Sequence, residues 1–139
     1  MNIKELKKWY EEQCFREGLY AIGDEPKLFE GLGLMKEDNQ FIWYFTERGQ
    51  KQIIKTFENE EEACEFVYNE IKDNDFARTH FLAFADDAET EDEIINKLNK
   101  RKIEYKTDKI PYQNGVYKTR IFVIGCDYKK VADLKDKYK

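Results

Sequence analysis

Phe41-Ile42-Trp43-Tyr44-Phe45 is the stretch of sequence that decides the fold. These consecutive apolar and aromatic residues supply side chains to both faces of a strand, so we expect a central strand covered on both sides. Polar turns flank it, Lys36–Gln40 before and Glu47-Arg48-Gly49 after. Beyond these turns lie two more strand-like stretches, Leu28–Met35 and Gln50–Phe57. The pattern predicts an antiparallel meander of three strands.

A second β region lies later in the sequence, around Asn114-Gly115. This dipeptide tolerates the two positive φ angles of a tight turn, so it predicts a hairpin of Ile103–Pro111 and Val116–Gly125. Shorter strands are predicted at Leu19–Ile22, which Asp24-Glu25-Pro26 ends, and at Phe81–Phe84, where a helix is the alternative.

Three capping boxes predict where helices begin. In such a box, a small polar side chain accepts a hydrogen bond from the backbone three residues later, where a Glu side chain reaches back. The pairs are Asn2 with Glu5, Asn59 with Glu62, and Thr90 with Glu93. We expect Gly18 to end the first helix and Asp127 to cap a final one.

These elements define an α+β protein. We predict a largely antiparallel sheet, made of the central meander and the C-terminal hairpin, with helices packed on it. The 139 residues match the usual size of one domain, and no linker divides them. We therefore expect a single α+β domain over residues 1–139.

Composition restricts the class of protein. Aromatic residues make up 15% of the chain and charged residues 38%, which argues against disorder and against a membrane protein respectively. The net charge of −5 disfavours nucleic acid and anionic membranes as partners and permits a cationic one. The start of the sequence carries charges where a signal peptide needs an apolar run. Cys14, Cys64 and Cys126 form no CxxC pair and are predicted to be small core residues in a reducing compartment, so we expect a cytoplasmic protein.

No catalytic or metal-binding signature is present in the sequence. His80 is the sole histidine, and it has no nucleophile motif around it, so we interpret it as a partly buried structural residue. Zinc spacings and phosphate-binding glycine loops are also missing. We expect no enzyme activity, no metal and no cofactor. The alternative is an enzyme that uses scattered acids such as Glu47 or Asp86 together with Arg120.

The segment Asp86–Glu93 carries six acidic residues in eight positions. Carboxylates at the start of a helix are stabilised by its dipole, which lowers their pKa and makes a catalytic acid pair implausible. The interpretation that we favour is a solvated helix start. The alternative is a patch that binds a basic partner.

The central meander and the helix after it resemble known proteins. The segment Phe41–Gly49, followed by Ile53, Phe57 and Glu61-Glu62-Ala63-Cys64, resembles bacterial immunity proteins of polymorphic-toxin and contact-dependent growth inhibition systems. Lys109–Tyr112 and Arg120–Val123 also fit this resemblance. The resemblance covers about half of the chain.

The resemblance implies a protein that binds one cognate toxin domain, often a nuclease, and occludes its basic active site. A toxin protein would then be the partner, with no nucleic acid and no membrane. The candidate partner-binding residues are Asp86, Asp87, Glu89, Glu91 and Asp92 in the acidic segment, with Tyr112 as an aromatic anchor and Glu47 at the turn. For Glu47, the interpretation that we favour is a local structural pair with Arg48, in a turn where Gly49 supplies a positive φ. The other function that we consider is a non-catalytic regulatory or adaptor module that binds a protein or a small ligand.

Overall fold

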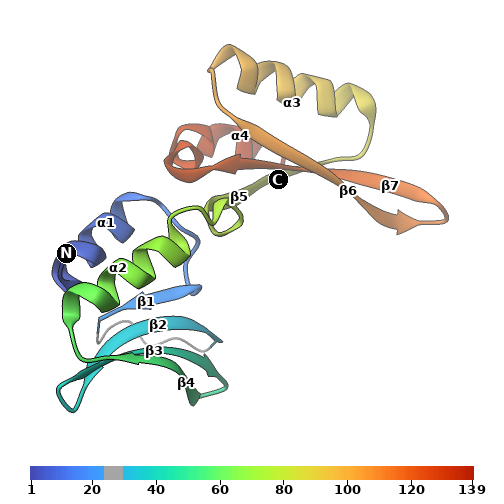
Figure 1. Cartoon of the computed structure of the whole chain (residues 1–139). Coiled ribbons are helices and arrows are strands. Elements are labelled where there is room, and N and C mark those ends of the chain that lie inside the picture. Colours follow the sequence, from blue (N-terminus) through green and yellow to red (C-terminus); the bar gives the residue numbers. More distant parts are fainter. Residues whose placement is uncertain (24–29) are drawn as a thin grey trace. The chain divides into compact units, whose positions relative to one another are not determined.

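The computed structural model describes residues 1–23 and 30–139 and divides into two compact units, residues 1–77 and 78–139 (Figure 1). The predicted α+β class is confirmed, and the strands form two mostly antiparallel sheets instead of the one expected. The break at Asp24-Glu25-Pro26 and the strand start at Leu28 lie outside the described residues. Each unit has its own hydrophobic core, and the single domain stays a prediction.

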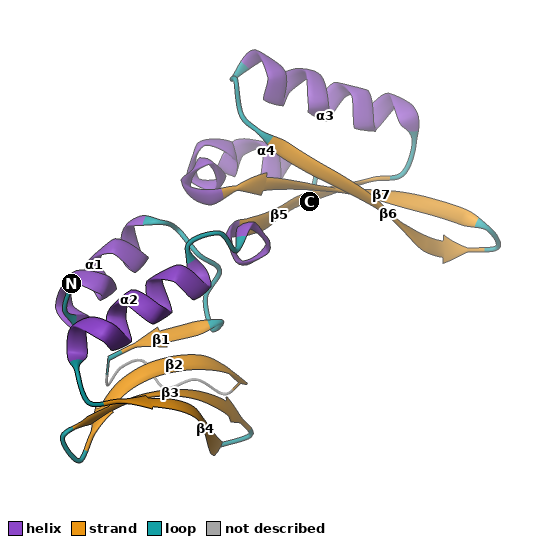
Figure 2. Ribbon diagram, in the orientation of Figure 1, coloured by secondary structure: helices purple, strands orange, loops and turns teal. Residues whose placement is uncertain are grey.

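Unit 1 is a four-stranded sheet with two helices on one face (Figure 2). In chain order its elements are α1 (Ile3–Glu12), β1 (Tyr20–Ile22), β2 (Glu30–Glu37), β3 (Gln40–Glu47), β4 (Gln50–Phe57), α2 (Glu60–Ile71) and the 3₁₀ turn η1 (Asp75–Arg78), which crosses into unit 2. The strand order is β1-β2-β3-β4, with β1 parallel to β2 and the other pairs antiparallel. The predicted meander is therefore confirmed.

The two turns of the meander are short, and their backbones explain the strand boundaries. Asp38 and Asn39 join β2 to β3, and Arg48 and Gly49 join β3 to β4, all four with positive φ. This is the geometry of two-residue hairpin turns, whose twist matches that of the strands. Gly49 provides the positive φ that the sequence predicted at this turn.

The core of unit 1 lies between the sheet and its two helices. Phe41 and Trp43 of β3 pack with Leu6 of α1 and Val67 of α2. The burial of each such side chain stabilises the folded state by about 1.5–3 kcal/mol. Alternate residues of β3 face the other side of the sheet and are also buried, as Tyr44 shows at 8% exposure. The prediction that this strand is covered on both faces is confirmed.

For the first two capping boxes, the predicted hydrogen bond from a backbone N–H to the Asn side chain is confirmed. The Asn2 side chain accepts from the N–H of Glu5 at 2.8 Å, and the Asn59 side chain from that of Glu62 at 3.1 Å. Gly18 does not end α1, because the helix stops at Glu12. Cys14 adopts a φ of +57° there, a left-handed conformation that ends a helix.

Unit 2 is a three-stranded antiparallel sheet with helices packed on one face. Its elements are β5 (Thr79–Ala85), α3 (Ala88–Lys100), β6 (Tyr105–Gln113), β7 (Val116–Ile124), the 3₁₀ segment η2 (Gly125–Val131) and α4 (Ala132–Lys137). The strand order is β5-β7-β6. The predicted strand at Phe81–Phe84 is confirmed, and so is the hairpin at Asn114-Gly115, where both residues have positive φ.

Two helix starts in unit 2 differ from the prediction. The N-cap of α3 is Asp87 instead of Thr90, and its side chain accepts from the N–H of Thr90 at 2.7 Å. An acceptor available three residues earlier therefore starts the helix one turn earlier. Asp127 lies within η2 and forms an ion pair with Lys130 at 3.1 Å, so it does not cap α4.

The cysteines occupy different environments. Cys64 is fully buried, and burial raises the pKa of its thiol to about 11, which makes it a poor nucleophile. Cys14 is half-buried and Cys126 is exposed, so the prediction of core cysteines is right for Cys64 and wrong for Cys126. Within the described residues, no helix is long and apolar enough to cross a membrane.

Candidate protein-binding surface

The sheet of unit 2 leaves one face without a helix. Residues of β7 alternate, so that Thr119, Ile121 and Val123 are buried toward α3 and α4, and the residues between them point to the opposite face. Cross-strand pairing adds side chains from β5 and β6 to that opposite face. We call it the aromatic face and define it by Phe81, Phe84, Tyr112, Lys118, Arg120 and Phe122.

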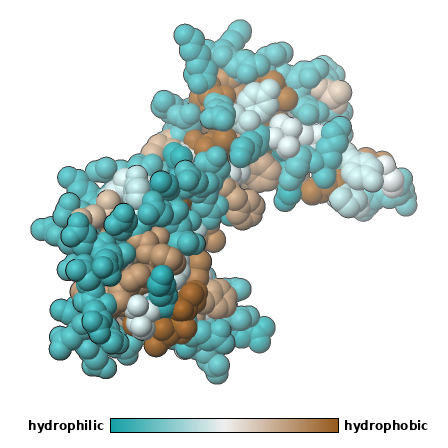
Figure 3. All heavy atoms as spheres, viewed as in Figure 1, coloured by the Kyte–Doolittle hydropathy of each residue, from teal (hydrophilic) through white to brown (hydrophobic). Residues whose placement is uncertain are grey.

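A β-bulge in β5 brings two phenylalanines to the aromatic face. Phe81 pairs with Phe122 and Phe84 pairs with Arg120, although a regular strand would point residues 81 and 84 to opposite faces. The rings of Phe81 and Phe84 lie 4.9 Å apart, and the Phe81 and Phe122 rings 5.9 Å apart. Phe84 is 44% exposed, so this cluster presents apolar surface to solvent. The space-filling view also shows hydrophobic side chains reaching the surface among hydrophilic ones (Figure 3).

Lys118 organises one half of the aromatic face. Its Nζ lies 3.2 Å from Oδ1 of Asp86, 3.8 Å from the centre of the Tyr112 ring and 5.7 Å from that of Phe84. The Lys118 side chain is 22% exposed, so its charge is held between a carboxylate and two aromatic rings. Two residues predicted from the sequence, Asp86 and Tyr112, are thus brought together by a third that the sequence did not indicate.

Arg120 organises the other half. Its guanidinium binds the Asp108 carboxylate with two hydrogen bonds, the Nε bond measuring 2.7 Å, and it lies 5.3 Å from the centre of the Phe122 ring. The hydrogen bonds from Arg120 lower the pKa of Asp108 and raise that of Arg120, so both groups stay charged. Both cations of the aromatic face, Lys118 and Arg120, are therefore already paired with an acid.

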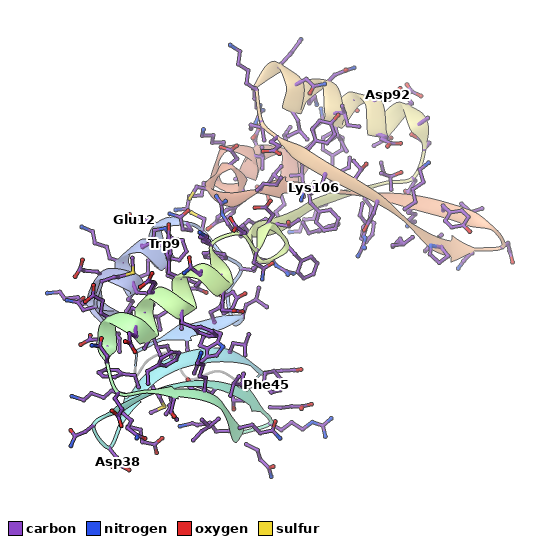
Figure 4. The ribbon with its side chains drawn as sticks, viewed as in Figure 1. Trp9, Glu12, Asp38, Phe45, Asp92 and Lys106 are labelled. Carbon is purple, nitrogen blue, oxygen red and sulfur yellow. The ribbon has the colours of Figure 1, made fainter. Side chains whose placement is uncertain are left out.

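Most of the acidic segment has a structural task. Asp87 caps α3, and the hydrogen bond from the backbone of Thr90 lowers its pKa. The Oε2 atom of Glu91 lies 3.4 Å from the Thr119 hydroxyl, within hydrogen-bond distance. Glu89 and Asp92 are exposed in the first turns of the helix, where Figure 4 labels Asp92. This arrangement fits a dipole-stabilised helix start, the interpretation favoured from the sequence.

Glu47 belongs to unit 1, whereas the other predicted partner-binding residues belong to unit 2. It ends β3 and pairs across the sheet with Glu30 of β2 and Gln50 of β4. His80 is in unit 2, where its ring stacks on Tyr128 with centres 4.2 Å apart, as a structural residue would. Among the described residues, no group of three or more His, Cys, Asp or Glu side chains could hold a metal ion.

The bulge is the main reason why sequence reasoning missed Phe81 and Phe84 as site residues. A strict two-residue alternation divides these aromatics between the faces, and only the register of β5 against β7 unites them. Comparison with protein families, with curated proteins and with solved structures finds no match for this chain.

Proposed function

We propose that the protein is a cytoplasmic immunity protein that binds a cognate bacterial toxin domain, a nuclease, and neutralises it by occluding its basic active site. It acts without catalysis and without a cofactor. The observation that carries the proposal is the aromatic face, an uncovered sheet surface with exposed rings and paired charges. It adds to the resemblance of the β3–β4–α2 region to immunity proteins.

The composition of the aromatic face suits a protein partner. Aromatic residues and arginine dominate the few contacts that carry most of the energy of an interface. Because Lys118 and Arg120 are already paired with Asp86 and Asp108, an approaching apolar surface does not leave either cation alone. Exposed apolar patches of this kind are commonly interaction sites in soluble proteins.

The acidic charge that supports a basic partner lies in unit 1. Residues 1–77 contain 18 acidic and 10 basic side chains, a net charge of −8, whereas residues 78–139 contain 11 acidic and 14 basic ones, a net charge of +3. An acidic unit attracts a basic active site and speeds the encounter, and this attraction weakens with salt. The aromatic face then supplies contacts that salt does not weaken.

The test is growth rescue combined with binding. The chain is expressed with the toxic domain encoded beside its gene, and the dissociation constant is measured with a catalytically inactive toxin. We expect protection of the cells, a stable complex, and an association rate that falls as salt rises. A folded protein that neither protects nor binds would reject the proposal and favour the regulatory adaptor.

A further inference from the structure

One end of the sheet in unit 1 has a cavity that is open to solvent, and the proposed function has so far given it no role. Cross-strand partners share a face, and Leu32 pairs with Phe45 as Glu30 pairs with Glu47. These four residues continue the rows of Leu34 and Trp43, so they lie on the helix-covered face of the sheet. Two hollows, of 390 and 370 Å³, both have Phe45 in their lining, and we call them together the sheet-end pocket.

The walls of the larger hollow are mostly apolar and partly fixed. The larger hollow is lined by Leu19, Tyr20, Leu32, Phe45 and Phe76 among others, and Figure 4 labels Phe45 near the end of β3. The Tyr20 hydroxyl accepts a hydrogen bond from the Asn74 side chain at 2.7 Å, which fixes that wall. Phe76 is 73% exposed, so the rim has apolar surface available for a partner.

The sheet-end pocket carries two acids directly opposite each other. Glu30 lines the larger hollow and Glu47 the smaller one, and neither forms an ion pair within residues 1–23 and 30–139. Side chains directly opposite in an antiparallel pair have their β-carbons about 5 Å apart, where like charges repel. Arg48 lines the smaller hollow, and the guanidinium of Arg16 lies 4.5 Å from the centre of the Phe76 ring. A cation placed between the two carboxylates would relieve their repulsion.

We infer that the sheet-end pocket receives a basic side chain, arginine by preference, from the active site of the toxin. This inference rests on the proposed function. The aliphatic stem of the arginine packs on Leu32 and Phe45, and its guanidinium lies between Glu30 and Glu47. Arginine suits the site because its planar group offers several donors to two carboxylates and it is more weakly hydrated than lysine. The net charge of −8 on this unit favours the same occupant.

The first experiment measures the affinity of the full chain for the inactive toxin. The variants are Glu30→Gln, Glu47→Gln and their combination, with Glu37→Gln as the matched control, because Glu37 is an exposed acid at the other end of β2. We expect each pocket variant to weaken binding by about tenfold, through faster dissociation, beyond the small effect of the control. If the toxin binds and the pocket variants behave like Glu37→Gln, the inference is wrong and the proposed function stands.

The second experiment tests the pocket without the toxin. The probe is the dipeptide acetyl-Leu-Arg-amide, compared with the same dipeptide carrying neutral citrulline, and the readout is the amide spectrum of the protein. We expect millimolar binding that shifts Leu32 and Phe45 with the arginine probe alone and disappears in the double variant. If the arginine probe binds in this way and the toxin does not bind, the pocket is supported as an arginine site and the toxin is rejected as its partner. No shift with either probe would contradict the inference.

Discussion

Replacement of Phe84 by alanine is the sharpest test of the aromatic face. Phe84 is 44% exposed, and a phenylalanine side chain can bury roughly 200 Å². A partner that covers the remaining exposed part therefore removes about 90 Å² from water, which at about 25 cal/mol per Å² stabilises the complex by about 2 kcal/mol. We expect Phe84→Ala to weaken toxin binding by about 30-fold.

The assay is calorimetric titration of the inactive toxin with the variant and with a control. Tyr117→Ala is the matched control, because Tyr117 is an aromatic residue of the same hairpin, 58% exposed, at a β7 position that alternates away from the aromatic face. Urea unfolding of both variants shows that each is folded under the conditions of the titration, since part of Phe84 is buried and its loss also affects stability. If Phe84→Ala binds as tightly as Tyr117→Ala, the aromatic face is not the interface.

Two further predictions concern folding. A Cβ atom on Gly33 would overlap the ring of Tyr44, approaching its Cε1 atom to 2.9 Å, so Gly33→Ala is expected to destabilise the protein by about 1–3 kcal/mol in urea unfolding. The hydrogen bonds from Arg101 lower the pKa of Asp133 to about 2 from its usual 3.8. Because the folded pKa is the lower one, the stability from this pair is present above pH 3.8 and is lost as the pH falls toward 2. We expect Asp133→Asn to lower thermal stability near neutral pH and to flatten its decline in acid.

Each of these two predictions has an outcome that contradicts it. Gly33→Ala with an unchanged urea midpoint would show that Tyr44 moves aside without cost. If Gly33→Ala does destabilise the protein, the double variant with Tyr44→Ala is expected to lose less stability than the sum of the two single changes, because the clash needs both side chains. For Asp133, an acid profile of the variant that runs parallel to the original would mean that the Arg101 pair adds nothing to stability.

The predictions that held depend on interactions within a few residues. The caps at Asn2 and Asn59 bond to backbone groups three positions away, and the turn at Asn114-Gly115 follows from the conformations that these residues tolerate. The same kind of reasoning placed the start of α3 one turn late, because both Asp87 and Thr90 are competent caps. Asp87 comes first along the chain, and the helix starts there.

The candidate sites depend on strand register, which local patterns do not determine. Asp86 and Tyr112 were predicted as partner-binding residues, but Lys118, which contacts both, was not. Glu47 was predicted at a turn, and its direct opposition to Glu30 became visible only with the pairing of β2 and β3. The acidic segment, the most conspicuous feature of the sequence, is largely a helix start.

By itself, the sequence determined the α+β class, the central strand covered on both faces, the hairpins and the two helix starts of unit 1. These features follow from side-chain periodicity and from hydrogen bonds between near neighbours, which a chain specifies locally. Only the tertiary structure decided that the strands form two sheets, that a bulge in β5 unites Phe81 with Phe84, and that Glu30 faces Glu47. A shift of one residue in register moves every side chain to the other face, and register depends on packing between distant segments.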